Sequence, residues 1–253
     1  HSTTYALLAY QTAYLKANYP RHFAAALLTI EAANTDKLAL YIGECRDRGI
    51  AVRPPDINES QLHFTVVPEG VRFGLTAIKG LGEGAIRAIL EARERLGALT
   101  SLHQLCEELD LRIANKRVFE ALVKSGACDS LIPQGVTLAA GRALLFGAID
   151  SALEHGNRVQ RDRERGQADL FGGGDGAGGG GLEIIRLPAS PPWSDMELLA
   201  HEREALGLYL SGHPVDRYAD DLRAFGAKTV ADLTLAELPA AEDGARAGSS
   251  SRT

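Results

Sequence analysis

The sequence predicts a mainly α-helical fold with one small β-hairpin. Apolar residues recur at spacings of three and four along most of the chain, as in Leu138–Leu153. Candidate N-cap residues precede these stretches, and glycines often follow them. Two short runs, 64–67 and 71–75, have strand character, and Pro68-Glu69-Gly70 between them is typical of a hairpin turn. A helical protein with little sheet is therefore expected.

Candidate cap residues and glycines predict where each helix begins and ends. Residues 50–52 are short and β-like, and Pro54-Pro55 follows them as an extended connector. A weak α/β pattern follows the last helix. The predicted helices occupy 2–18, a stretch from Pro20 through Ile30, a stretch from Asp36 to a stop at Gly49, 83–96, 101–105, 115–123, 138–153 and a stretch that starts at Ser194 or Asp195.

Composition narrows the class of protein. The chain has 253 residues, enough for one large domain or two small ones. Its net charge of −6 argues against a protein that coats DNA through bulk charge, so any nucleic-acid contact must be local. Cys45, Cys106 and Cys128 lack metal-ligand spacing and indicate a reduced, cytoplasmic setting. No apolar run is long enough to span a membrane, so no membrane partner is expected.

The stretch from Ile78 to Ile89 has the strongest functional pattern. Two glycines flank one leucine, and an amphipathic helix follows at once. Because glycine lacks a Cβ, the turn is tight, and the helix start presents unpaired N–H groups with a positive dipole end. These features predict an anion site for a DNA phosphate, bound without regard to base sequence. The alternative is a helix corner that only packs. The candidate contacts are Lys79, Gly80, Leu81, Gly82 and Gly84.

A second turn of this kind is expected at Lys124-Ser125-Gly126-Ala127, between two predicted helices. Lys124, Ser125 and Gly126 are its candidate DNA contacts, and paired turns would grip phosphates on two strands. The alternative, left open by the sequence, is that Gly126 is only a helix C-cap.

The composition changes from Asn157, where arginines alternate with polar residues before a glycine-rich run through Gly181. Such a segment buries too little apolar area to offset its ordering entropy, so a mobile loop is expected. Leu170 and Phe171 inside it are predicted to anchor on a partner protein, each contributing about 1.5–3 kcal/mol by burial. Gln167 would add a directional hydrogen bond. The alternative is that the apolar pair folds back on the parent core.

Several stretches together resemble one family, the alpha subunits of bacterial DNA polymerase III, the replicative polymerases of the C family. The resemblance covers about residues 1–235 in the family's order. The matching features are the end of the fingers, the segment before the hairpin, the entry to a helix-hairpin-helix module, the sliding-clamp motif and the helix end before an OB domain. They lie at His1–Lys16, Pro54–Asn58, Phe73–Gly82, Gln167–Phe171 and Gly207–Pro214.

The resemblance implies four regions. Residues 1–60 would form the C-terminal part of the fingers domain, and 61–156 a tandem helix-hairpin-helix DNA-binding module. Residues 157–192 would form a flexible loop that carries the clamp-binding motif, with Gln167, Asp169, Leu170 and Phe171 as contacts. Residues 193–253 would form a helix and linker toward a truncated OB domain.

The activity that the resemblance implies is template-directed DNA synthesis with Mg²⁺. The family's catalytic aspartates lie upstream of His1, so this part is expected to hold no catalytic residue, metal ligand or cofactor and to be inactive alone. Asp220-Asp221 is expected to be a solvated helix face. His1, Lys16 and Arg21 are possible nucleotide or template contacts. The implied partners are double-stranded DNA, the sliding clamp and other replicase subunits.

Two alternative functions differ in class. One is a non-catalytic helix-hairpin-helix module, for example from a repair protein, that binds DNA and the sliding clamp. Such a module need not carry the fingers-like residues 1–58. The other is a helical scaffold with no nucleic-acid role, which a salt-dependent DNA shift assay would distinguish.

Overall fold

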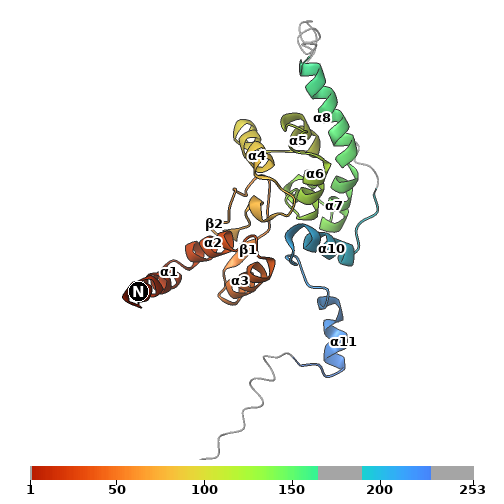
Figure 1. Cartoon of the computed structure of the whole chain (residues 1–253). Coiled ribbons are helices and arrows are strands. Elements are labelled where there is room, and N and C mark those ends of the chain that lie inside the picture. The colour runs from red at the N-terminus through yellow and green to blue at the C-terminus, as the bar shows by residue number, and fades with distance from the viewer. Residues whose placement is uncertain (1, 165–189, 229–253) are drawn as a thin grey trace, which may run out of the picture. The chain divides into compact units, whose positions relative to one another are not determined.

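The computed structural model describes residues 2–164 and 190–228 and separates a unit that ends at Gly212 from a second that begins at His213. The described chain is mostly helical and carries one small sheet, which confirms the predicted fold class (Figure 1). No helix among these residues is both long and apolar enough to span a membrane. The anchor residues 167–171 and His1 lie outside the described residues.

Three helices open the larger unit: α1 (Ser2–Asn18), α2 (Pro20–Ile30) and α3 (Thr35–Asp47). Pro20 starts α2, as predicted, since its missing N–H has no helical partner at that position. The cap of α3 differs from the prediction. The side chain of Asn34, not Asp36, accepts the Lys37 amide, so Asp36 lies in the first turn. Gly49, at φ 70°, follows this helix.

The sheet contains β1 (Ala51–Arg53), β2 (Thr65–Val67) and β3 (Gly70–Arg72), with β3 in the middle. β2 and β3 form the predicted hairpin, and β1 pairs with β3 in parallel, which the sequence pattern did not indicate. Gly70 has φ 151°, and a Cβ there would lie 2.0 Å from the carbonyl oxygen of Ala51. The close approach of β3 to β1 at this position therefore requires glycine.

The helices that follow build the core. They begin with the short η1 (Leu75–Ala77), then α4 (Glu83–Leu96), α5 (Leu102–Glu108) and α6 (Lys116–Lys124), and η2 (Asp129–Leu131) ends the series. α4, α5 and α6 each bury one face. The fully buried side chains at their centre include Ile86, Ile89, Leu105, Phe119 and Leu122.

The predicted helix 138–153 is in fact two helices, α7 (Leu138–Gly147) and α8 (Ile149–Glu164). Ala148 separates them, and its amide bonds to the carbonyls of Leu144 and Leu145. The loop predicted from residue 157 therefore starts too early. The side-chain amide of Gln160 donates to the carbonyls of Cys106 and Leu109, each at 2.8 Å, so packing on α5 keeps 157–164 helical.

α10 (Asp195–Leu206) follows the undescribed segment and lies beside α6 (Figure 1). Ser194 caps it through a capping box with Glu197. The Trp193 ring lies 4.3 Å from the His201 ring and 5.7 Å from the Phe146 ring of α7. Aromatic packing thus fixes the start of α10 against α7.

A buried ionic cluster fastens the same helix to the core. Arg142 of α7 is 2 % exposed and donates to Asp129 at 2.7 and 2.8 Å and to Glu202 of α10 at 3.2 Å. The other carboxylate oxygen of Glu202 accepts the amides of Leu210 and Ser211. Burial raises the pKa of the Asp129 carboxyl, although its contact with Arg142 opposes the rise.

The second unit is described only to residue 228. It contains η3 (Asp216–Tyr218) and α11 (Ala219–Ala224). Asp220 and Asp221 lie in the exposed first turn of α11, and Asp220 accepts a hydrogen bond from Arg223 at 2.8 Å. This position agrees with the solvated helix face that the sequence indicated.

Candidate nucleic-acid interface

The turn between η1 and α4 presents an exposed backbone. Lys79, Gly80, Gly82 and Gly84 are exposed, whereas Leu81 is only 9 % exposed and joins the core. Gly80 has φ 82°, a value that favours glycine. Leu81 therefore anchors the turn from below, while the glycines on either side of it face solvent.

The amides of this turn are open to a ligand. Among the described residues, the N–H groups of Gly80, Gly82 and Gly84 have no protein acceptor. Gly82 is the N-cap of α4 and has no side chain to cap the helix, and a Cβ at Gly80 or Gly82 would meet no atom within 4 Å. Free amides at a positive helix end form a favourable site for an anion.

Two further contacts define the edges of this turn. The amide of Lys79 is not free, because it donates to the carbonyl of Ala205 in α10 at 2.8 Å. Glu83, the first residue of α4, pairs with Arg87, and the hydrogen bond from Arg87 lowers the pKa of the Glu83 carboxyl. The negative charge closest to the open amides is therefore paired with a cation.

A second turn joins α5 to α6 and was not among the predicted contacts. Asp110 accepts the Arg112 amide at 2.9 Å and the Arg112 guanidinium at 2.8 Å, and these hydrogen bonds lower the pKa of Asp110 to about 2. Asn115 caps α6 by accepting the Arg117 amide at 3.0 Å. The order of short helix, tight turn and longer helix repeats that of η1, the glycine turn and α4, although α4 lacks a side-chain cap.

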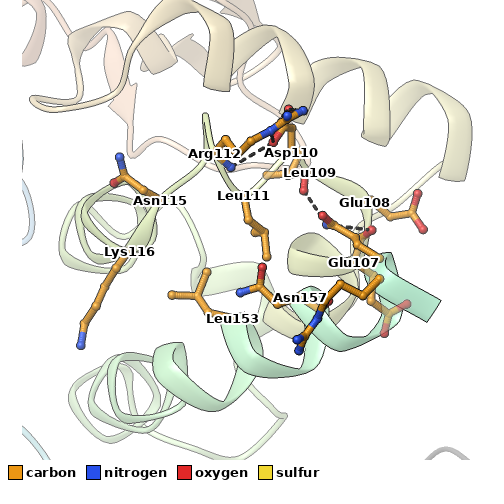
Figure 2. A pocket seen from close by; sticks show the side chains of 12 residues that line it. Glu107, Glu108, Leu109, Asp110, Leu111, Arg112, Asn115, Lys116, Leu153 and Asn157 are labelled. Carbon is orange, nitrogen blue, oxygen red and sulfur yellow. Dashed lines mark hydrogen bonds and ion pairs between the residues drawn. The ribbon is translucent and has the colours of Figure 1, made fainter. Parts of the chain in front are cut away.

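The two turns lie side by side. A Cβ built on Gly84 would lie 3.4 Å from the Cγ2 atom of Ile113, which is itself half exposed. On the far side of the second turn is an open pocket of about 650 Å³, between it and α8 (Figure 2). Three acidic and three basic side chains line this pocket, so it lacks the net positive charge that would favour a phosphate.

The predicted second site at Lys124-Ser125-Gly126 has a different environment. Ser125 and Gly126 are buried, and the Gly126 amide donates to the carbonyl of Val123 at 3.1 Å. A Cβ on Gly126, at φ 83°, would lie 2.2 Å from an Arg142 nitrogen. This geometry favours the C-cap alternative over a phosphate contact. The sequence feature that indicates the second turn at 109–115 instead is the repeated order of helix, turn and helix, with Asn115 as an N-cap.

Lys124 is engaged with its neighbours. Its Nζ lies 2.8 Å from a carboxylate oxygen of Glu204 and 5.5 Å from the Phe146 ring centre. It nevertheless lines the same pocket as Lys79, because α6 and the glycine turn meet α10 there. Of the predicted basic contacts, these two are therefore brought together by the fold.

The other predicted contacts make internal interactions or are not described. Lys16 lies 3.3 Å from Glu44, and Arg21 donates to the carbonyl of Pro68 at 2.8 Å. His1 and the clamp motif fall outside residues 2–164 and 190–228. Within those ranges, no group of three or more His, Cys, Asp and Glu side chains is placed to hold a metal ion. No catalytic step is assigned to the described residues.

These two adjoining turns lie in the part of the chain that carries a helix-hairpin-helix motif. The helix-hairpin-helix motif family matches residues 49–136, which include both turns. The chain is also similar to DNA polymerase III subunit alpha of several bacteria. Identity is 42% over 235 residues for Pasteurella multocida, 40% over 246 for Saccharopolyspora erythraea and 42% over 238 for Thermus aquaticus.

The chain belongs to the DNA polymerase III alpha subunit family. The three alignments cover 92%, 96% and 94% of this chain but only 19%, 20% and 18% of the relatives. The chain thus spans about a fifth of the length of the curated relatives it matches. Because the alignments cover nearly all of this chain, they confirm the family resemblance.

Proposed function

We propose that this chain binds the phosphate backbone of duplex DNA through the two adjoining turns, as part of a replicative polymerase subunit. The observation that carries the proposal is the set of open amides at Gly80, Gly82 and Gly84, which face solvent at the positive end of α4. Contacts with phosphates carry no base information, so the binding is independent of sequence.

The polymerase function belongs to the whole subunit. The relatives are named as DNA polymerase III alpha subunits, and we propose that this part holds duplex while Mg²⁺-dependent nucleotide addition takes place elsewhere in the subunit. The isolated chain is then inactive. This proposal also includes an OB domain after α11 and other replicase subunits as partners. A separate repair module is less favoured, because the similarity to these relatives begins within the first helices and extends well past the two turns.

Binding to a labelled duplex at increasing salt tests the DNA-binding proposal. Because each neutralised phosphate releases counterions, log K is expected to fall linearly with log salt, with a slope of about −0.9 for each phosphate contacted. A chain with net charge −6 should contact few phosphates and show a shallow slope. Fluorescence anisotropy with duplexes of unrelated sequence is the measurement. Undetectable binding at low salt, or strong preference for one sequence, would contradict the proposal.

A second proposal concerns the sliding clamp and depends on the sequence motif alone. Gln167, Asp169, Leu170 and Phe171 are proposed to enter a pocket on the clamp, with the two apolar side chains providing most of the burial. Replacing Leu170 and Phe171 by alanine should abolish capture by immobilised clamp, since about 3–6 kcal/mol of burial is lost. Duplex affinity serves as the control and should not change. Clamp capture at the wild-type level would show that the motif is wrongly assigned.

A further inference from the structure

A pocket of about 250 Å³ lies where the glycine turn, α6 and α10 meet. Three cations line it, namely Lys79 from the turn, Arg117 from the first turn of α6 and Lys124 from the last turn. Its acidic lining residues are Glu120 and Glu204. The pocket is therefore lined by basic residues from both helix-hairpin-helix elements, and the flexible Lys79 side chain places its ammonium beside Gly207 at the end of α10.

Two of the three cations have no ion-pair partner in the described part of the chain. Lys124 is neutralised by Glu204 at 2.8 Å. Arg117 and Lys79 are exposed, and neither forms an ion pair with any other described residue. Unpaired cations from separate elements that line one pocket provide charge complementarity for an anionic ligand.

The position of Arg117 is unfavourable for the helix itself. The first turn of α6 contains Lys116 and Arg117 and no acidic residue, although a helix N-terminus favours negative charge. Lys116 is compensated by Asp150 of α8 at 2.7 Å, whereas Arg117 has no such carboxylate among the described residues. A bound anion would relieve this local conflict, and departures of this kind are expected at functional sites.

We propose that the Arg117 guanidinium and the Lys79 ammonium together hold a second DNA phosphate, next to the phosphate at the amides of Gly80 and Gly82. This inference depends on the proposed duplex binding. The guanidinium suits this role because its planar N–H groups bond two phosphate oxygens at once, while the ammonium acts as a point charge. The DNA contact then extends from the first hairpin onto α6 along one strand.

The test compares Arg117→Gln with the matched control Arg53→Gln. Arg53 is also exposed and has no ion pair with another described residue, but it lies in β1, outside the proposed interface. Both changes remove one positive charge. Anisotropy with a fluorescein-labelled duplex should show that Arg117→Gln weakens binding about fivefold to tenfold at low salt and makes the salt slope shallower by about 0.9. Arg53→Gln should leave both unchanged.

Two further variants sharpen the result. Arg117→Lys should keep the salt slope but recover only part of the affinity, because bidentate bonding is lost. In the double variant with Lys79→Gln, the loss of affinity should fall short of the sum of the single losses, since both groups contact one phosphate. Additive losses of binding free energy would contradict the proposal that both side chains contact the same phosphate.

The failures of the two proposals are distinguishable. If the wild type binds duplex with the expected salt dependence but Arg117→Gln behaves like Arg53→Gln, only this inference is overturned. If the wild type does not bind duplex, the proposed function fails and the inference fails with it. Thermal melting of each variant should match or slightly exceed that of the wild type, because the replaced side chains are exposed and the Arg117 charge is unfavourable at a helix N-terminus.

Discussion

At the residue scale, Gly80 and Gly82 occupy the same turn for different physical reasons. Gly80 has φ 82°, where any other residue is strained by about 1–2 kcal/mol. Gly82 has φ −75° and ψ 150°, which every residue adopts, and a Cβ there would meet open space. A serine or aspartate N-cap would stabilise α4 by roughly a few tenths of a kcal/mol relative to glycine. Glycine forgoes that gain and leaves the helix amides free.

The buried thiols give a pH prediction at the same scale. Burial raises the pKa of Cys106 from 9.0 to about 12 and also raises the pKa of Cys128. A raised folded-state pKa stabilises the fold below pH 9, and this contribution is lost as pH rises from 9 toward 12. At pH 8, Cys106 should therefore react with a thiol reagent about a thousandfold more slowly than in denaturant.

Mass spectrometry after pulse labelling assigns the rate to each cysteine. Cys45 is also buried, but burial raises its pKa less strongly than that of Cys106, so it provides an internal comparison. Equal labelling rates for Cys106 in the native and denatured protein would contradict the burial that the structure gives α5.

At the scale of elements, α10 holds the first hairpin in position. Its Ala205 carbonyl accepts the Lys79 amide, and Glu202 joins the buried cluster with Arg142 and Asp129. Replacing one partner of a buried ion pair leaves an uncompensated charge in the core. The position of the glycine turn therefore depends on a helix that is more than 100 residues away in sequence.

Glu202→Ala should consequently destabilise the fold by about 3–5 kcal/mol, because Arg142 loses a charge partner and two amides lose their acceptor. Glu204→Ala is the matched control, since the Glu204 side chain is 61% exposed and its pair with Lys124 should contribute at most about 1 kcal/mol. Urea unfolding followed by Trp193, the chain's one tryptophan, reports directly on α10. Similar losses of unfolding free energy in the two variants would show that the buried cluster does not stabilise the packing of α10.

At the scale of the whole molecule, local patterns predicted the helices and long-range contacts decided the rest. The start of α2 at Pro20 and the extent of α4 follow from caps and periodicity. The parallel pairing of β1 with β3 depends on a strand almost twenty residues away, which periodicity does not encode. The end of α8 was missed for the same reason, because Gln160 is held by the carbonyls of α5.

In the candidate interface too, local features were predicted from the sequence and long-range contacts were not. The glycine turn was predicted from its sequence, since its features are local. The place of the second turn was not, because Gly126 has the same local pattern but is buried against Arg142. The proximity of Lys79 to Arg117 depends on how α4, α6 and α10 pack, so no spacing in the sequence predicts it.

The central claim is that the amides beside Gly82 hold a DNA phosphate. Duplex affinity of Gly82→Asp, compared with Gly82→Ala, tests it most directly. Alanine leaves the amides free, whereas aspartate caps them and places a negative charge in the phosphate site. The account predicts that Gly82→Asp melts at a higher temperature yet binds duplex at least about tenfold more weakly than Gly82→Ala, which binds nearly as well as the wild type. Equal duplex affinity of the aspartate and alanine variants would contradict it.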